Sequence, residues 1–128
     1  MEKNRDLSET LEDYLETILE LQTIKTVARS KDIAEKLDIK RGSVTGMLKK
    51  LAEKELINYE PYGYVTLTPA GRKIARKIEQ RHQVLKDFFT RILKVDAEKA
   101  DQTACRMEHA MDDDTFARFK DFIRKVDT

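Results

Sequence analysis

Three side chains that can bind metal stand close together near the C-terminal end of the chain. Cys105, Glu108 and His109 occupy positions i, i+3 and i+4, so a helix would carry them on one face. A thiolate, a carboxylate and an imidazole together suit a borderline-soft divalent cation, provided that other segments supply further ligands. The spacing alone also fits a cysteine packed in the core beside a solvated Glu–His pair, so both interpretations stay open here.

Further candidate donors lie elsewhere in the chain. Asp13 and Glu16 are i, i+3 neighbours on another predicted helix, and His82 is the only other histidine. Residues 1–20 and residues 96–114 each contain seven acids and two bases. Clustered carboxylates can face a cation. The alternative is that these charges are solvated surface.

A basic segment lies between the two acidic ones and suggests a different partner. Residues 40–50 contain no acid and four bases that can face phosphates, Lys40, Arg41, Lys49 and Lys50. Ser43 and Thr45 can reach base edges or phosphates of double-stranded DNA. Gly46 has no side chain with which to read a base, so we expect DNA shape to carry part of the specificity.

The elements that must position these residues begin with three helices. Apolar residues in 11–21 recur at the helical period, and Ser8 precedes them as a possible N-cap. Shorter helices are predicted over 30–37 and 43–54, joined by a tight connection. Two short helices with bases in the turn and on the second helix are typical of a helix-turn-helix.

The apolar period then changes to that of strands. Residues 56–59 and 64–67 are β-prone, and the turn residues 61–63 between them predict a hairpin, the wing of a winged helix. Thr68 and Pro69 then begin a long helix that we expect to reach about residue 93.

Two further helices are predicted, over 97–110 and 113–125. Apolar residues accumulate in the second half of the long helix, beyond what one small winged helix can cover. We therefore predict a two-fold homodimer through these helices. The interface residues that we expect are Val84, Leu85, Phe88, Phe89 and Ile92.

Length and composition limit the remaining possibilities. A chain of 128 residues with 38% charged and 40% hydrophobic residues fits a helix-rich globular protein, either one domain or a small domain with a helical extension. No apolar run can span a bilayer, and the N-terminus has no export signal. One cysteine excludes an intramolecular disulfide and fits the reducing cytoplasm. We find no Gly-rich phosphate loop, nucleophile elbow or HExxH pattern, so we expect no enzyme and no small-molecule substrate.

The motifs of the chain, in the order in which they occur, resemble those of the diphtheria toxin repressor family of metal-dependent regulators. The chain resembles a short form of that family, without the extra C-terminal domain of longer members. The resemblance rests on LEDYLETILEL at 11–21, KDIAEKLDIKRGSVTGMLKKL at 31–51, GYVTLTPAGRKIA at 63–75, RH at 81–82 and CRMEH at 105–109. It implies a mainly α fold with a small β-hairpin, in which a winged helix-turn-helix at 1–70 precedes a helical metal-binding and dimerisation domain at 71–128.

The resemblance also implies a ligand set and an activity. By position, Asp13, Cys105, Glu108 and His109 match the principal metal site. Glu16 and His82 match further ligands of the manganese-responsive branch. The implied activity is repression of transcription when Fe(II) or Mn(II) binds, in control of metal homeostasis.

The sequence departs from both branches of that family. Iron-responsive members resemble it at Cys105 but usually have Met at the position of Asp13; manganese-responsive members have Asp there but Glu at the position of Cys105. Lys86 stands where the iron branch has a second-site glutamate, so a second site of that kind is not expected.

We expect Fe(II) as the activator, because the thiolate is the one donor here that suits Mn(II) poorly. Mn(II) is the alternative, and Co(II), Ni(II) or Zn(II) can bind in vitro. The competing function is a winged-helix regulator that does not respond to metal.

Overall fold

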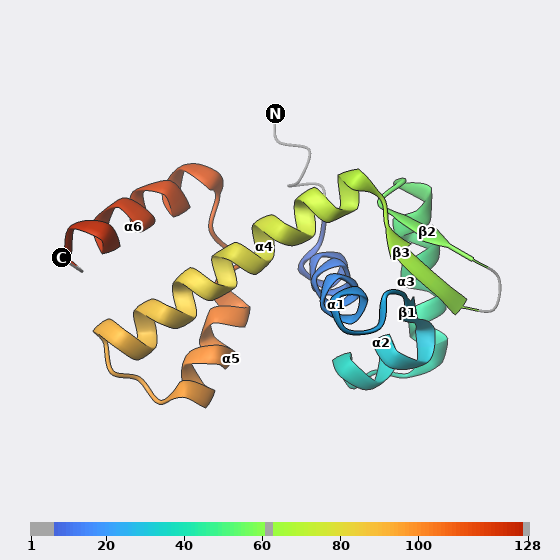
Figure 1. The fold of residues 1–128 in the computed structure, drawn as a ribbon, viewed down its shortest axis with the longest axis horizontal. Helices are drawn as coiled ribbons and strands as arrows, with labels where there is room; N and C mark the ends of the chain where they lie inside the picture. Colours follow the sequence, from blue (N-terminus) through green and yellow to red (C-terminus); the bar gives the residue numbers. More distant parts are fainter. Residues whose placement is uncertain (1–6, 61–62, 127–128) are drawn as a thin grey trace. The chain divides into compact units, whose positions relative to one another are not determined.

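The computed structural model describes residues 7–60 and 63–126. The chain is mainly helical and carries one small antiparallel sheet (Figure 1), which confirms the predicted fold class. Internal contacts divide the chain into two compact units within helix α4 (Pro69–Asp87), the first ending at Arg76 and the second beginning at Lys77. Among the described residues, no helix is long and apolar enough to cross a bilayer.

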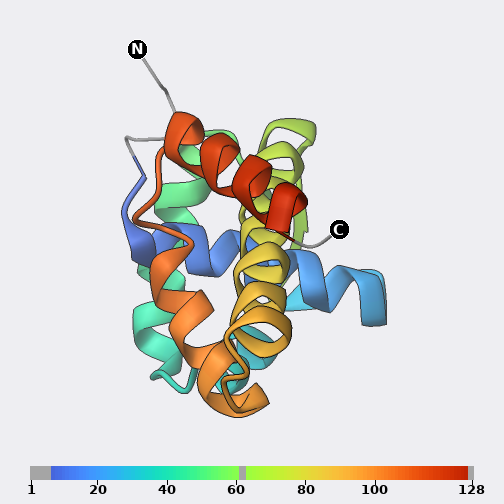
Figure 2. The same ribbon diagram turned by 90° about the vertical axis from the view of Figure 1, so that its left-hand side faces the viewer.

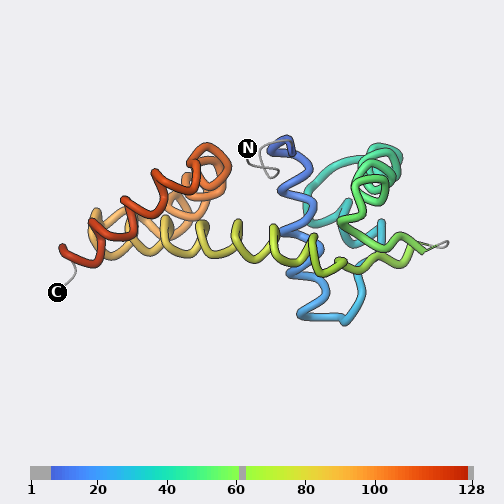
Figure 3. Tube along the Cα trace, turned by 90° about the horizontal axis from the view of Figure 1, so that it is seen from above, coloured from blue at the N-terminus to red at the C-terminus, as the bar shows by residue number. Residues whose placement is uncertain are grey.

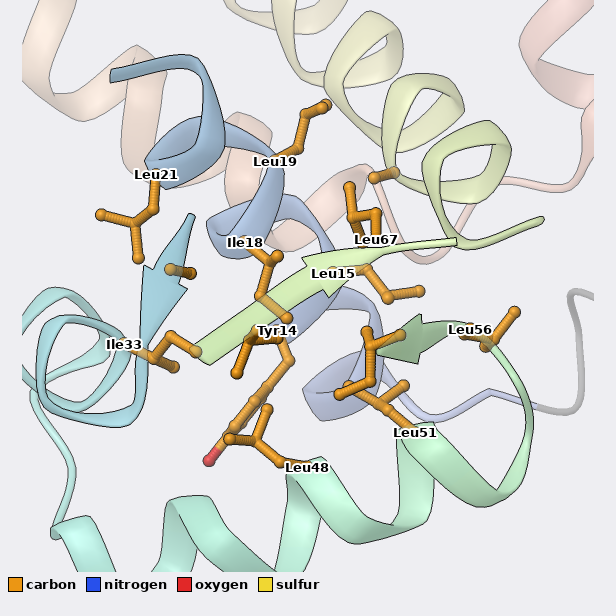
Figure 4. Close-up of a cluster of buried hydrophobic side chains, with 14 of the residues drawn as sticks. Tyr14, Leu15, Ile18, Leu19, Leu21, Ile33, Leu48, Leu51, Leu56 and Leu67 are labelled. Atoms are coloured by element: carbon orange, nitrogen blue, oxygen red, sulfur yellow. The ribbon is translucent and has the colours of Figure 1, made fainter. Parts of the chain in front are cut away.

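Helix α1 (Glu9–Lys25) is the central helix of the first unit. The Leu11 amide donates to the Ser8 hydroxyl at 3.2 Å, which confirms the predicted N-cap. Tyr14, Leu15 and Ile18 are buried on the face that packs in the core (Figure 4). The helix is longer than the predicted 11–21, because an apolar stripe marks only the buried turns and not the solvated ends.

Helices α2 (Ser30–Leu37) and α3 (Arg41–Glu53) form the predicted helix-turn-helix. Helix α2 ends where Asp38 takes a left-handed conformation with φ 57°, and the chain turns within three residues. Helix α3 starts two residues before the predicted Ser43. Its buried residues are Val44, Leu48 and Leu51, and Figure 4 shows Leu48 beside Tyr14 of α1.

The wing is a three-stranded sheet rather than a two-stranded hairpin. Strands β2 (Ile57–Tyr59) and β3 (Tyr64–Leu67) pair as predicted, and β1 (Ala28–Arg29) pairs with the other edge of β3. A strand of two residues cannot show a period, so β1 was not predicted. Two of the predicted turn residues, at positions 61 and 62, lie outside the described residues.

The sheet leads into α4 through one capping residue, so the trace passes from β3 into the helix without a loop (Figure 3). The Gly71 amide donates to the Thr68 hydroxyl at 3.1 Å, which confirms Thr68 as the N-cap. Gly71 also lets this turn lie against the chain after α3, since a Cβ there would be 1.9 Å from the carbonyl oxygen of Leu56.

The second unit consists of the rest of α4, a π-helical turn η3 (Phe88–Ile92), α5 (Ala97–Met107) and α6 (Asp113–Val126), seen in Figure 2. Leu85, Ala100 and Ala104 are fully buried, and the rings of Phe88 and Phe119 meet edge to face at 5.0 Å. The long helix therefore reaches about the predicted residue but finishes in π geometry. The prediction of a helix over 97–110 was too long, because α5 ends at Met107.

Candidate DNA-binding surface and metal site

Helix α3 presents the predicted DNA contacts on its outer side. Val44, Leu48 and Leu51 fill its inner face, and Met47 packs partly against the same core, which leaves the polar residues of the helix on the outer side. Thr45 is half-buried, and the others are exposed, namely Lys40, Arg41, Ser43, Lys49 and Lys50. This arrangement offers four positive charges, one at the N-cap and three on α3 itself, to a phosphate backbone.

A cleft of about 530 Å³ joins the start of α3 to the wing. It brings together two of the predicted residues and five that the sequence did not suggest. Its lining residues are Arg29, Ser30, Lys31, Arg41, Thr45, Tyr59 and Gly63. The lining carries three bases and no acid, so it adds to the positive surface of α3.

Arg29 is the best-anchored of the additional bases. Its guanidinium donates to the Tyr64 hydroxyl at 3.3 Å and lies 4.9 Å from the centre of the Tyr64 ring. The two residues are direct partners across β1 and β3. Arg29 and Lys31 flank the first residue of α2, and this pair of bases beside a helix start was the available sequence signal.

The acidic donors of the first unit lie on α1. Asp13 and Glu16 are half-buried and about one turn apart. They flank Tyr14 and Leu15, which are locked in the core of the unit. The two carboxylates are therefore carried by a helix that packs against α2 and the sheet.

In the second unit, His82 lies between two carboxylates. Its Nδ1 is 2.7 Å from Glu108 Oε1, and its Nε2 is 2.7 Å from Asp101 Oδ1. The hydrogen bond with His82 and the charge of Lys86, 3.5 Å away, lower the pKa of Asp101 below its ordinary value, although burial opposes the shift. The structure thus brings two of the predicted ligands together with an acid that the sequence did not suggest.

Glu108 has the properties of a cation ligand. Its side chain is 0% exposed, and Oε2 has no hydrogen-bond partner among the described residues. The His109 Nε2 atom is 3.3 Å from this Oε2, and the His109 side chain is almost fully buried. Burying a carboxylate oxygen without a hydrogen bond costs free energy. A divalent cation would supply the missing interaction, so the donor set of this unit fits a metal.

Arg81 fixes the backbone that carries these ligands. Its guanidinium donates to the carbonyl oxygens of Glu108 at 3.3 Å and of Met111, and it pairs with Asp113. Burial opposes a low pKa for Asp113, but Lys77 and Arg81 together bring that pKa below its ordinary value. Arg81 is itself buried, so the turn after α5 is held by a charged group with several partners.

Cys105 differs from the other predicted ligands of this segment. It is exposed on α5, whereas Glu108 and His109 follow the end of that helix at Met107. Among the described residues, no group of three potential ligands within 4.8 Å of one another includes Cys105. Glu108 still keeps helical geometry and its amide donates to the Ala104 carbonyl oxygen, so the helix end alone does not move Cys105 off this face. Cys105 as a ligand stays a prediction.

The predicted interface residues differ in what they expose. Val84, Phe88, Phe89 and Ile92 are half-buried and retain surface that a partner can cover. Leu85 is fully buried within one chain, so it supports the surface from behind. Large apolar side chains are also exposed at Leu93, which follows this set, and at Phe122 and Val126 of α6.

Two models of known protein families match this chain, one over each part of it. Residues 6–65 match the model described as iron dependent repressor, N-terminal DNA binding domain, and residues 68–128 match iron dependent repressor, metal binding and dimerisation domain. An uncharacterized HTH-type transcriptional regulator of Methanocaldococcus jannaschii is 38% identical over 120 residues, covering 93% of this chain and 96% of the relative. The HTH-type transcriptional regulator MntR of Bacillus pumilus is 38% identical over 115 residues, covering 90% of this chain and 79% of the relative.

A solved structure shares the fold. The manganese regulator SloR superposes with a TM-score of 0.79 at 28% identity, over 89% of this chain and 53% of that one. The chain thus spans about half the length of that solved protein. From both matched domains and the extent of the identity, the chain belongs to the iron-dependent repressor family of metal-dependent, DNA-binding transcriptional repressors, whose members are regulators and not enzymes.

Proposed function

We propose that this chain is a homodimeric repressor of the cytoplasm that binds a double-stranded DNA operator when Fe(II) or Mn(II) is bound, and so controls genes of metal homeostasis. The observation that carries the proposal is the fully buried Glu108, with one oxygen unsatisfied and two imidazoles beside it. Such a carboxylate is expensive to bury unless a cation completes its surroundings.

The proposed ligands are those that the resemblance to the family implies. Asp13 and Glu16 of α1 would contribute carboxylate oxygens, and His82, Glu108 and His109 would contribute the donors of the second unit. Oxygen and imidazole donors suit Mn(II) and Fe(II) alike. The relatives include a regulator whose name specifies manganese.

We assign the choice between these two metals to Cys105. A thiolate in the ligand set would favour Fe(II) over Mn(II), and this is the basis on which the sequence favours iron. If Cys105 stays at the exposed surface that it occupies on α5, the remaining donors leave Mn(II) and Fe(II) close to equal.

The coupling to DNA follows from the construction of α1. If Asp13, Glu16 and Glu108 share one cation, the mutual repulsion of their carboxylates opposes that arrangement until the cation is bound. A bound divalent cation supplies the charge against which they can converge. Because Tyr14 and Leu15 lock α1 into the core that also holds α3, fixing α1 fixes the DNA-binding helix of each protomer. In a dimer, two such helices at a set separation match half-sites roughly 34 Å apart.

DNA binding would use the exposed bases of α3 and the cleft beside the wing. Lys40, Arg41, Lys49 and Lys50 would neutralise phosphates, with Ser43 and Thr45 at base edges or phosphates. Since Gly46 offers no contact, sequence-dependent DNA shape would contribute to specificity.

The test compares Glu108→Gln with the parent protein. Binding to labelled DNA from upstream of its own coding region is measured by fluorescence anisotropy, with chelator, with Mn(II) and with anaerobic Fe(II). For the parent, we expect metal to raise the DNA affinity by about 5- to 150-fold, the usual size of such a coupling. Glu108→Gln keeps the shape and removes the charge, so it should lose most of this response.

Asp114→Asn is the matched control. Asp114 is an exposed carboxylate on α6, and it forms an ion pair with Arg118, which lies one helical turn away. The variant should respond to metal like the parent. Equal DNA affinity of the parent with and without metal would instead establish a winged-helix regulator that does not respond to metal.

A further inference from the structure

Asp101 is the acidic residue of the second unit whose role the ligand set leaves unexplained. It lies on α5, where its neighbour Ala100 is fully buried in the helix packing. One of its carboxylate oxygens receives two groups from α4, His82 Nε2 at 2.7 Å and Lys86 Nζ at 3.5 Å. His82 and Lys86 are one helical turn apart, so both reach Asp101 from the same side.

The two carboxylates that flank His82 have different surroundings. Glu108 faces Nδ1 and is fully buried, whereas Asp101 faces Nε2 and its side chain is 52% exposed. Asp101 already forms an ion pair with Lys86, whose positive charge offsets that of the carboxylate. The imidazole therefore has an inner nitrogen toward the candidate metal ligands and an outer nitrogen toward a surface ion pair.

We propose that Asp101 is a positioning residue, which accepts a hydrogen bond from His82 Nε2–H and thereby presents Nδ1 as the metal-binding atom. The inference rests on the proposed function, in that His82 is taken as a ligand. A neutral imidazole carries one proton, and the partner of one nitrogen decides which nitrogen is free to bind metal. The same hydrogen bond fixes the plane of the ring, so that no rotation has to be arrested when metal binds.

Lys86 has a supporting part in this arrangement. Lys86 stands where the iron branch of the resembled family has a second-site glutamate, and its ammonium cannot bind metal. The structure gives it another use, since it holds the Asp101 oxygen that His82 contacts. Lys86 acts on Asp101 and not on the cation, so its loss should have a smaller effect than the loss of Asp101.

The first measurement is Zn(II) affinity by competition calorimetry for the parent, Asp101→Ala and Asp101→Asn. Replacing the carboxylate partner of a metal-bound histidine lowers metal affinity by about 10- to 100-fold, which is our expectation for Asp101→Ala. Asp101→Asn keeps an oxygen that accepts the Nε2 proton, so its loss should be smaller. Asp114→Ala removes an exposed acid elsewhere in the unit and should bind Zn(II) like the parent.

The second measurement is the tautomer of His82 in the Zn(II)-loaded protein, read from long-range ¹H–¹⁵N spectra. The parent and Asp101→Asn should carry the proton on Nε2 alone, and Asp101→Ala should lose this single state. Reduced affinity with an unchanged tautomer would overturn the positioning role, because Asp101 would then act through its charge only.

His82→Ala separates this inference from the proposed function. If His82→Ala weakens Zn(II) binding and Asp101→Ala does not, Asp101 has no positioning role while His82 remains a ligand. If neither variant changes the affinity, His82 is not a ligand, and the inference about Asp101 is overturned with that assignment.

Discussion

Arg41→Ala provides a quantitative test of the DNA-binding surface. Arg41 lies at the start of α3 and lines the cleft beside the wing, where no acid of the lining offsets its charge. Each phosphate contact changes the slope of log K against log salt by about 0.9, and a homodimer carries the substitution twice. We therefore expect the slope to become less steep by about 1.8.

This slope change has a direct consequence for affinity. Between 50 and 200 mM salt, the ratio of parent to variant affinity should fall by about 12-fold. The assay is fluorescence anisotropy with metal present at four or more salt concentrations, on operator and random DNA. Both DNAs should show the same slope change, because a phosphate contact carries no sequence information.

Lys54→Ala is the control, since Lys54 caps the opposite end of α3 and lies roughly 20 Å from Arg41 along the helix. It removes the same charge, so it separates a local contact from the effect of net charge. A slope unchanged by Arg41→Ala, or changed equally by both substitutions, would remove the start of α3 from the interface.

Three further predictions concern the second unit. Cys105→Glu should shift metal-activated DNA binding toward Mn(II) relative to anaerobic Fe(II), and an unchanged Fe-to-Mn ratio would show that Cys105 is not a ligand. Ile92→Glu places a charge on a half-buried surface of the proposed interface, so the variant should sediment as a folded monomer with weak DNA affinity; a parent that is monomeric at micromolar concentration with metal would contradict the dimer. Asp113→Asn should lower the free energy of unfolding by up to about 1 kcal/mol at neutral pH, since the exposed carboxylate is screened. The folded-state pKa of Asp113 is lowered, so this stabilisation is present above its unfolded pKa and lost as pH falls through the folded one; denaturant unfolding of parent and variant should therefore converge in acid, and a difference that persists there would refute the ion-pair argument.

Apart from strand β1 and the π-helical turn η3, the sequence by itself determined the order and type of the elements. The helical period over 11–21, the β-prone runs after α3 and the Thr68–Pro69 helix start each have local physical causes, namely periodic burial, side-chain propensity and capping. The same local reasoning found the bases of α3, because the inner residues of an amphipathic helix identify its outer ones. It also identified Glu108 and His109 as candidate donors from their side-chain chemistry.

Very short elements and the ends of helices could not be predicted in this way, because they depend on how the chain packs. Strand β1 forms only because β3 offers an edge to two residues that have no detectable period. Helix α5 ends at Met107, where Arg81 of α4 binds the carbonyl groups that follow. Among the described residues, Cys105 also joins no cluster of three potential ligands, although the spacing had placed it with Glu108 and His109.

The surroundings of each donor were decided by tertiary structure alone. Spacing along the chain does not show that Glu108 is fully buried with an unsatisfied oxygen, or that Asp101 and Lys86 meet beside His82. These properties arise between residues that lie 15 to 26 positions apart in the chain. Burial and hydrogen bonding depend on distances through space, and it is these that distinguish a buried, partnered donor from an exposed one of the same chemistry.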